Sequence, residues 1–460
     1  MINRRQFLRT GTAISLAMLS NLSMCTRNLT SKPLNILLMM ADDLGYSDLG
    51  CYGSKEIQTP VLDQLAAGGI RFTDYYAVAP NCSPSRAAIM TGRFPFRAGI
   101  YSYIAPNSSV HLRTMEKTIP KLLLQSGYAT AHVGKWHLSS DLQRKPLPTP
   151  GEHGFNYWFA TANNAEPSHH NPLNFIENGK AVGEIPGYSC QIVADRAIQW
   201  LNKGRQPDQP FLLNVWFHEP HRKVAAPPHL LEKHPDCEDA AYLACVENMD
   251  QAIGRILKQL DQLSLSENTL VIFTSDNGSY REGSNDDFKG SKSWVWEGGI
   301  RVPMLMRLPG RIQPNSLNAV PCGGVDLMPT FCDLTNIMLS DADKLDGQSL
   351  TPVFRNEPIN RKKPLFWFFY RRDPACALRD GDWSLIGYLN KPVPPGHSFR
   401  PSHQMYIKQT KISRFELYHL KEDPRQQNNV ANKFPDRLQA MQKQMVTYHE
   451  QIIAEFVNWF

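Results

Sequence analysis

Two pairs of polar residues in this 460-residue chain carry oxygen ligands that suit a hard metal ion. Asp42 and Asp43 follow the apolar run LNILLMMA, and Asp276 and Asn277 follow the run TLVIFTS. Carboxylate and amide oxygens favour calcium or magnesium over zinc, which prefers nitrogen and sulfur. Asp42 and Asp43 alone would fit a helix cap or a surface turn. With the second pair added, the sequence predicts a divalent metal site, with Ca²⁺ as the expected ion and Mg²⁺ as the alternative.

A cysteine in the segment NCSPSRAAIMTGR, residues 81–93, has a setting that favours chemistry. Pro84 fits the first turn of a helix and Gly92 its end, which puts Cys82 just before a helix N-terminus. Free amides and the helix dipole favour an anion there, so a thiolate would be acidic and reactive. The partner pattern of a catalytic thiol is absent, and a soft sulfur does not suit hard-cation ligands. A buried, inert cysteine would leave Arg86 and the metal ligands unexplained, so we expect this sulfur to be converted into an oxygen nucleophile.

Two further apolar runs lead directly into polar residues. YATAHV is followed by GKWH, residues 134–137, and FLLNVWF is followed by HEPH, residues 218–221. Ligands of doubly wound sheets bind outside the carboxyl ends of the strands. Four polar clusters at such ends therefore predict one functional site at one edge of a sheet.

The elements that would position this site alternate between strands and helices. The buried strands are predicted over residues 34–41, 128–133, 211–217, 269–275 and 302–308. Runs this continuous suit a parallel sheet covered on both faces. Helices are predicted over residues 240–263, 59–69 and 118–127, the first amphipathic and the other two ended by glycine. The alternation predicts an α/β fold with a large, mostly parallel sheet sandwiched by helices.

The sequence pattern changes near residue 350, after a stretch rich in turn formers. KPLFWFFYR, DWSLIGY and FELYHL have the pattern of short strands, and DRLQAMQKQMVTYHEQIIAEF that of a closing helix. These features predict a smaller C-terminal α+β unit. We therefore expect an export signal and linker over 1–32, a catalytic α/β domain over 33–350 and a C-terminal subdomain over 351–460.

The N-terminus resembles an export signal. Arg4 and Arg5 form a twin arginine, and the apolar stretch after them is too short to span a bilayer comfortably. This pattern is typical of a twin-arginine signal, with an ordinary secretory signal as the alternative. The segment LSMC resembles a lipoprotein cleavage box, so lipid anchoring at Cys25 is a further alternative. No other segment is long and apolar enough to cross a membrane, and we expect an exported, periplasmic or secreted protein that is not an integral membrane protein.

Charge and cysteine usage exclude two other classes of protein. The net charge of +6 falls to +3 without Arg4, Arg5 and Arg9 of the signal, which is the balance of a soluble protein and not of a nucleic-acid binder. The nine cysteines show no C-x-x-C pairs, so no zinc knuckle can be recognised, and their disulfide pairing cannot be deduced.

The segment CSPSR, residues 82–86, followed by Thr91 and Gly92, matches the type I sulfatase signature C-x-P-S-R-x4-T-G. The motifs NILLMMADDLGYSDLGCYG, GKWHL, HGFNYW, SDNG, WEGGIRVP and ELYHLKEDP also look like that family, in the expected order. Over most of its length the chain thus resembles the formylglycine-dependent sulfatases of the alkaline-phosphatase-like superfamily. The resemblance implies their fold with a smaller C-terminal domain, a sulfuric ester hydrolase activity, and a dedicated maturation enzyme that oxidises Cys82 to Cα-formylglycine.

The same resemblance implies roles for the site residues. The aldehyde at position 82 would be hydrated to a gem-diol, and one hydroxyl, held at the metal, would attack sulfur while the alcohol leaves. The second hydroxyl would then lose a proton, so that sulfate is eliminated and the aldehyde is regenerated. Position 82 thereby joins the four oxygen ligands at the metal. Arg86, Lys135 and Lys292 would neutralise the sulfuryl oxygens. His137 would be the base that drives sulfate elimination, and His221 with Lys292 would act at the leaving oxygen.

Substrate contacts are expected from two loops. The polar segment 163–172 either lines the substrate mouth, with Asn164, His169 and His170, or is a solvated loop. Asn164 falls near a position where the family often contacts sulfate. His218 and Arg222 flank His221 in a way that departs from the family pattern, and we expect them to contact substrate as well.

The resemblance favours hydrolysis of a sulfate ester on a carbohydrate or polysaccharide, because exported sulfatases of bacterial type commonly serve polysaccharide breakdown. A phosphonate or phosphate monoester hydrolase of the same superfamily is the alternative. A non-catalytic binder of sulfated glycans is disfavoured, since it would have no need of Cys82. The expected partners are the sulfated carbohydrate and the maturation enzyme.

Overall fold

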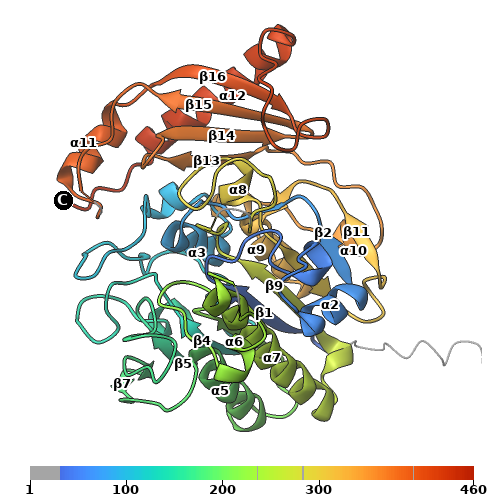
Figure 1. Cartoon of the computed structure of the whole chain (residues 1–460). Coiled ribbons are helices and arrows are strands. Elements are labelled where there is room, and N and C mark those ends of the chain that lie inside the picture. Colours follow the sequence, from blue (N-terminus) through green and yellow to red (C-terminus); the bar gives the residue numbers. More distant parts are fainter. Residues whose placement is uncertain (1–31, 236, 282–283, 397) are drawn as a thin grey trace, which may run out of the picture. The chain divides into compact units, whose positions relative to one another are not determined.

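The structure, a computed structural model, describes residues 32–460 except 236, 282–283 and 397. The predicted export signal, with Arg4, Arg5 and Cys25, lies outside the described residues. Residues 34–460 pack as one unit, drawn in colour in Figure 1. Among the described residues, none of the helices combines the length and the hydropathy that a membrane span requires. The eight cysteines of this part of the chain are all unpaired thiols.

A ten-stranded sheet forms the larger layer, in the order β11-β2-β10-β9-β1-β8-β4-β5-β6-β7. The five strands from β9 to β5 in this order are parallel. The bounds are β1 Asn35–Ala41, β2 Ile70–Phe72, β4 Ala129–Lys135, β5 Tyr157–Thr161, β6 Ile176–Glu177, β7 Lys180–Ala181, β8 Phe211–Trp216, β9 Thr269–Ser275, β10 Met304–Arg307 and β11 Ser316–Asn318. Every residue of β1, β4, β8 and β9 is buried, as expected for parallel strands covered on both faces. The prediction of a large, mostly parallel sheet is confirmed.

The last predicted strand differs in direction from the other four. The strand predicted over 302–308 is β10, Met304–Arg307, which runs antiparallel to β9. A parallel return would need a crossover of a dozen or more residues, usually a helix, packed against the sheet. The connection after β9 instead winds through the loop that carries Lys292, and the one helix among its described residues is the short α8, Glu297–Ile300.

Helices cover both faces of this sheet. Alternate residues of β1 belong to different cores, with Leu37 and Met39 packed in the cluster that includes helices α2, α5 and α7, and Ile36 and Leu38 in a second cluster. The helix bounds are α2 Pro60–Ala67, α3 Cys82–Thr91, α4 Ile119–Gln125, α5 Ser189–Lys203, α6 Pro228–Leu231, α7 Ala240–Gln262, α9 Leu327–Leu334 and α10 Thr351–Phe354. The three predicted helices correspond to α7, α2 and α4, while α5 and β5 were not predicted.

A second sheet follows in the C-terminal part, with α12 packed against it (Figure 1). It is antiparallel, in the order β13-β14-β15-β16. Its elements are β13 Leu365–Phe369, β14 Ala375–Asp380, β15 Trp383–Leu389, α11 Pro401–Gln409, β16 Ile412–His419 and α12 Pro435–Ala454. Two further strands, β3 Tyr75–Tyr76 and β12 Cys322–Gly323, pair with each other. The α+β character of this part is as expected, and the domain boundary near residue 350 stays a prediction.

Candidate active site

Four neighbouring parallel strands end at one edge of the large sheet, and each leads into predicted site residues. Asp42 follows β1, Asp276 follows β9, the loop 218–221 follows β8, and Lys135 is the last residue of β4. Because β9, β1, β8 and β4 are adjacent and parallel, these side chains converge.

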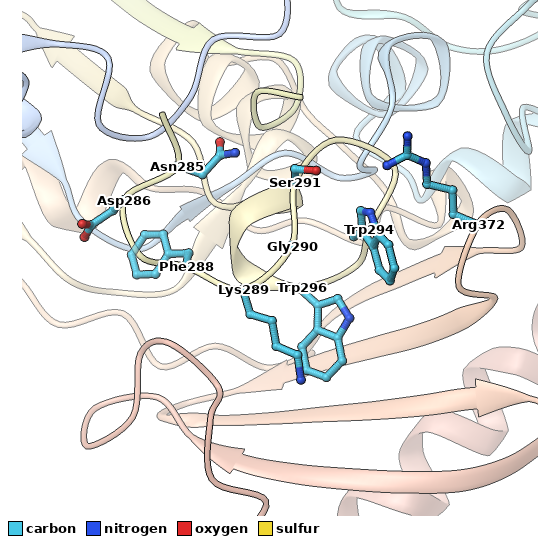
Figure 2. A pocket seen from close by; sticks show the side chains of 9 residues that line it. All are labelled: Asn285, Asp286, Phe288, Lys289, Gly290, Ser291, Trp294, Trp296 and Arg372. Atoms are coloured by element: carbon cyan, nitrogen blue, oxygen red, sulfur yellow. The ribbon is translucent and has the colours of Figure 1, made fainter. Parts of the chain in front are cut away.

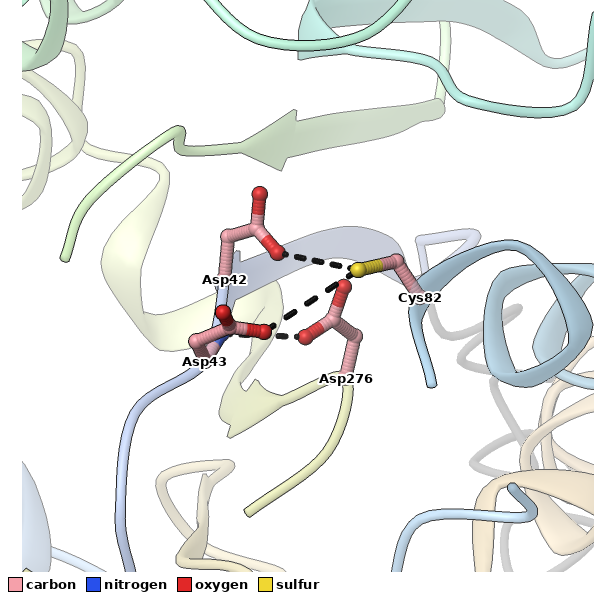
Figure 3. Close-up of side chains that lie close together, drawn as sticks. All are labelled: Asp42, Asp43, Cys82 and Asp276. Atoms are coloured by element: carbon pink, nitrogen blue, oxygen red, sulfur yellow. Dashed lines mark hydrogen bonds between the residues drawn. The ribbon is translucent and has the colours of Figure 1, made fainter. Parts of the chain in front are cut away.

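Three carboxylates and the Cys82 thiol form a buried cluster, drawn in Figure 3. One ligand atom from each of Asp42, Asp43, Cys82 and Asp276 lies within 4.8 Å of all the others. The Cys82 Sγ is 3.5 Å from Asp42 Oδ1 and 4.0 Å from Asp43 Oδ1. Asn277 donates its amide to Asp43 Oδ1 at 2.8 Å, and its own Oδ1 is buried without a partner among the described residues. A buried, unsatisfied oxygen beside three carboxylates fits a hard divalent cation.

Three cationic side chains balance these carboxylates. The Arg86 guanidinium donates from Nε to Asp276 Oδ2 at 2.9 Å and pairs with the same oxygen through Nη2 at 2.7 Å. Lys135 Nζ forms an ion pair with Asp42, and Lys292 Nζ lies 2.6 Å from each carboxylate oxygen of Asp43. Three negative and three positive groups face one another, so a bound divalent cation would leave the site positively charged. Such a site would attract an anionic group.

The pKa values of Asp42 and Asp276 are shifted in opposite directions. Burial disfavours the charged form of both, but Lys135 and the other cations around Asp42 outweigh it and hold the pKa of Asp42 well below its usual range. Burial together with the charge of Asp42 raises the pKa of Asp276 to about 7. A cation bound between Asp42 and Asp276 would favour the ionised form of both carboxyls.

Cys82 is the first residue of α3, with Asn81 as the N-cap. Burial raises the pKa of its thiol well above the usual value, and the nearby Lys292, whose Nζ is 3.6 Å from Sγ, does not compensate. The expectation that this thiol would be acidic is therefore wrong, because desolvation outweighs the nearby lysines. An unmodified Cys82 is a protonated and weakly nucleophilic thiol.

Two predicted catalytic histidines lie beside the cluster. His137 Nε2 is 3.1 Å from the carbonyl oxygen of Ile104, so Nε2 carries the proton of the neutral ring. Its Nδ1 is buried without a partner among the described residues, which leaves a lone pair able to accept a proton. His221 Nε2 lies 3.6 Å from Asp43 Oδ2. Burial lowers the pKa of His221 to about 4, although Asp43 opposes the shift.

Of the residues predicted to contact substrate, all within the described part of the chain, only Asn164 forms a hydrogen bond with a side chain that pairs with the carboxylate cluster. Its Oδ1 accepts a hydrogen bond from Lys135 Nζ at 3.1 Å. His218 is buried, and its Nε2 lies 2.7 Å from Oγ1 of Thr161, the last residue of β5, so its ring binds the end of that strand. Arg222 is exposed, with its guanidinium 4.5 Å from the centre of the Tyr280 ring.

The two histidines of the segment 163–172 lie apart from the cluster. His169 is completely buried, with Nδ1 3.7 Å from Glu219 Oε1 and 3.5 Å from the Cys245 Sγ. His170 is exposed and packs on Tyr188 at a centroid distance of 4.8 Å. The structure does not bring either of them to the cluster, because the backbone that follows Asn164 carries His169 into the core and His170 to the surface.

Glu219 is a residue that the sequence analysis overlooked. Its buried carboxylate accepts hydrogen bonds from the backbone amides of His218 at 3.0 Å and Cys190 at 2.9 Å, and from the Ser189 hydroxyl. Its own carbonyl oxygen accepts from the backbone amide of Asp42 at 2.9 Å. Glu219 thereby joins three segments behind the site. A glutamate between two histidines in HEPH was the only signal in the sequence.

Comparisons with known proteins agree with this geometry. A family model described as Sulfatase matches residues 34–337, and one described as N-sulphoglucosamine sulphohydrolase, C-terminal, matches residues 288–393. The chain is 33% identical to steryl-sulfatase of Mus musculus over 440 residues, covering 76% of this chain and 69% of the relative. It is 32% identical to N-acetylgalactosamine-6-sulfatase of Canis lupus familiaris over 381 residues, covering 76% and 71%. A crystal structure of Ps i-CgsB in complex with k-i-k-neocarrahexaose superimposes with a TM-score of 0.80 at 27% identity, covering 93% of this chain and 95% of the other.

Proposed function

This chain belongs to the sulfatase family and is a sulfuric ester hydrolase with an alkaline-phosphatase-like fold, and we propose that it removes sulfate from a carbohydrate. The observation that carries the proposal is the position of Cys82, buried at the start of α3 with three carboxylates around its sulfur. A protonated thiol is a poor nucleophile there, which supports its conversion to Cα-formylglycine by a maturation enzyme that recognises residues 82–86.

The residues that would hold the metal are Asp42, Asp43, Asp276 and Asn277, together with position 82 after its conversion. We propose Ca²⁺ as the ion, with Mg²⁺ as the alternative, because all the side-chain ligands are oxygens. A hydrated formyl group would supply an oxygen nucleophile, and a divalent cation held by these residues would supply Lewis-acid polarisation.

The remaining residues of the cluster bind the sulfate and move protons. Arg86, Lys135 and Lys292 point cationic groups at the space around position 82, where they would balance the charge that develops on the sulfuryl oxygens. Asn164 would hold Lys135 in this orientation and contact the sulfate. The free Nδ1 of His137 would accept a proton during sulfate release. His221, on the side of Asp43, would act with Lys292 at the leaving oxygen.

A carbohydrate substrate is supported by the relatives. N-acetylgalactosamine-6-sulfatase carries a sugar in its name, and Ps i-CgsB was crystallised with an oligosaccharide. We further propose that residues 1–32 form an export signal that sends the protein to the periplasm or the medium, by the twin-arginine route. Residues 33–350 would form the catalytic domain and 351–460 a C-terminal subdomain, a division supported by the separate sheet that begins at Leu365.

The experiment that tests this function is a hydrolysis assay on the full chain co-expressed with a formylglycine-generating enzyme and loaded with calcium. We expect release of sulfate from an aryl sulfate and from at least one sulfated sugar. Phosphate and phosphonate monoesters are measured in parallel. Replacing the nucleophile, Cys82→Ala, should lower kcat/KM by about a thousandfold or more.

The matched control is Cys237→Ser, which changes a half-buried thiol outside the cluster and should leave kcat/KM unchanged. Faster hydrolysis of phosphate or phosphonate monoesters than of every sulfate ester would favour the alternative activity. Equal activity of wild-type protein and Cys82→Ala would contradict the proposed nucleophile.

A further inference from the structure

A cavity of about 500 Å³ lies beside the site, on the loop that carries Lys292. Ser291 and Trp294, one and two residues from Lys292, line it, so their Cα atoms lie within about 8 Å of that of Lys292. Lys292 Nζ in turn lies 3.6 Å from the Cys82 sulfur. The cavity is therefore a neighbour of the sulfate position, and Figure 2 shows the side chains that surround it.

The walls of this cavity are mainly aromatic and cationic, with one carboxylate, that of Asp286, at the end away from Trp294 and Arg372. Trp294 and Arg372 project on one side of it, Phe288 on the opposite side, and Lys289 with Trp296 below (Figure 2). Lys289 Nζ already lies 3.6 Å from the centre of the Trp296 ring. Among the residues that the structure describes, the Trp294 ring stacks on no aromatic ring or cation, and Arg372 has no ion pair or hydrogen bond. Trp294 is half-buried against the hydrophobic core and lines the cavity together with Arg372, so one aromatic side chain and one guanidinium are available to a ligand there.

The loop that carries Trp294 is fixed in place by its backbone. The amide of Lys292 donates to the carbonyl of Ser279 at 2.9 Å, the amide of Ser293 to that of Pro80 at 2.8 Å, and the amide of Trp294 to that of Ser291 at 3.0 Å. Ser279 follows the metal ligands of β9, and Pro80 precedes α3. The Trp294 wall and Lys292 are therefore held at a set spacing, which is the condition for recognising two groups of one ligand at once.

Arg372 comes from the other sheet, in the turn between β13 and β14, and is exposed. A guanidinium forms paired hydrogen bonds with planar or tetrahedral oxyanions. Pockets that bind organic ligands combine aromatic walls with a few such polar groups. A sugar ring lying on Trp294 with an acidic substituent toward Arg372 would contact both side chains.

We propose that this cavity is a second sugar subsite, which binds the residue next to the sulfated sugar and prefers a residue that itself carries a sulfate or carboxylate group. The inference rests on the proposed function and narrows its substrate from any carbohydrate sulfate to an oligosaccharide with at least two acidic groups. Trp294 supplies the stacking face, and Arg372 binds the second acidic group.

The test is a calorimetric titration of calcium-loaded Cys82→Ala protein, which binds without turnover. Two pairs of probes are compared: N-acetylgalactosamine 6-sulfate with a chondroitin 6-sulfate tetrasaccharide, and galactose 4-sulfate with an iota-carrageenan tetrasaccharide. In at least one pair we expect the tetrasaccharide to bind at least tenfold more tightly than the monosaccharide. This gain should disappear with Arg372→Ala, fall with Trp294→Ala and be largely retained with Trp294→Phe.

The matched control is Arg311→Ala, which removes an exposed arginine outside the cavity and should preserve the gain. Equal affinity within both pairs, no binding of either tetrasaccharide, or a gain that survives Arg372→Ala would overturn the proposal. None of these binding results would contradict the proposed function, which is tested by hydrolysis of the aryl and monosaccharide sulfates by the converted enzyme.

Discussion

Charge balance among a few buried side chains organises the site at the scale of single residues. Asp42, Asp43 and Asp276 are each paired with a lysine or arginine, and all of these side chains are buried or nearly so. Buried charges are tolerated only when they are paired or bind a metal. The Oδ1 of Asn277 is buried without a hydrogen-bond partner among the described residues, which suits the proposed cation.

Calcium should therefore stabilise the folded protein and not only its activity. We expect the thermal midpoint to fall on chelation and to rise again with added Ca²⁺. When free calcium exceeds Kd a hundredfold, its binding should stabilise the folded protein by about 2.7 kcal/mol. Asp276→Ala removes one ligand and should abolish most of this calcium-dependent shift in a thermal melt. Glu184→Gln, which neutralises an exposed carboxylate, should keep the full shift. A midpoint that is independent of calcium in the wild-type protein would contradict the metal site.

At the scale of elements, strand ends and helix starts position these residues, and side chains from distant helices fix those ends. The N-terminus of α2 is an example. Its N-cap, Thr59, makes no capping hydrogen bond. Asp250 of α7 takes that role, accepting from the backbone amides of Val61 at 3.1 Å and Leu62 at 2.9 Å.

The burial of the Asp250 carboxyl makes stability depend on pH in a defined direction. Burial, with the charges of Asp63 and Glu247, raises the pKa of Asp250 to about 7 from an unfolded value near 4. A raised pKa in the folded state means that the stabilisation is complete below about pH 4 and is lost as the pH rises to about 7. Asp250→Asn cannot titrate, so the melting temperature of wild-type protein relative to this variant should fall across that window.

The control for this measurement is Asp208→Asn, because Asp208 is exposed. The difference in melting temperature between wild-type protein and this variant should stay constant over the same pH range. A flat difference for Asp250→Asn as well would show that its carboxyl has an ordinary pKa in the folded protein.

The loop before α8 depends on close backbone packing. A Cβ on Gly299 would lie 2.1 Å from the carbonyl oxygen of Trp294 and 2.5 Å from that of Ser291. Gly299→Ala should therefore displace the segment that holds Lys292 and lower kcat/KM for an aryl sulfate by about tenfold or more. Gly151→Ala, where the nearest atom would be 3.4 Å away, should have wild-type kinetics. Wild-type kinetics for Gly299→Ala would mean that the loop adapts and does not position Lys292.

At the scale of the whole molecule, the parts of the chain before and after the proposed boundary near residue 350 share contacts. The Trp367 indole donates to the carbonyl of Ala77 at 2.7 Å, and Arg379 pairs with Asp74 at 3.0 Å. One hydrophobic cluster extends from Ile36 in β1 to Met445 in α12. The C-terminal part therefore supports the catalytic sheet, and also supplies Arg372 to the cavity.

Shared packing of this kind predicts cooperative unfolding. Scanning calorimetry of the calcium-loaded protein should give one transition whose calorimetric and van't Hoff enthalpies agree. Two resolved transitions would show that residues 351–460 unfold as an independent domain.

The parts of this molecule that were predictable from its sequence are those with local signals. Continuous apolar runs identify β1, β8 and β9, and the polar residues after them identify the cluster, because parallel strands must end at one edge. The direction of β10 and the burial of His169 depend on how the intervening loops pack, for which no local pattern exists. The meeting of Trp294 with Arg372 joins residues far apart in the chain, and only the tertiary fold brings them together.

The proposed function depends on the conversion of Cys82 into an oxygen nucleophile, and the mass of the peptide that carries residue 82 reveals whether this conversion has occurred. The peptide is taken from a preparation purified from the native host and shown to release sulfate from its substrate. Conversion to the aldehyde replaces sulfur by oxygen and removes two hydrogens, and we predict this mass in the active protein. An active preparation in which the peptide keeps the unmodified thiol would contradict the account.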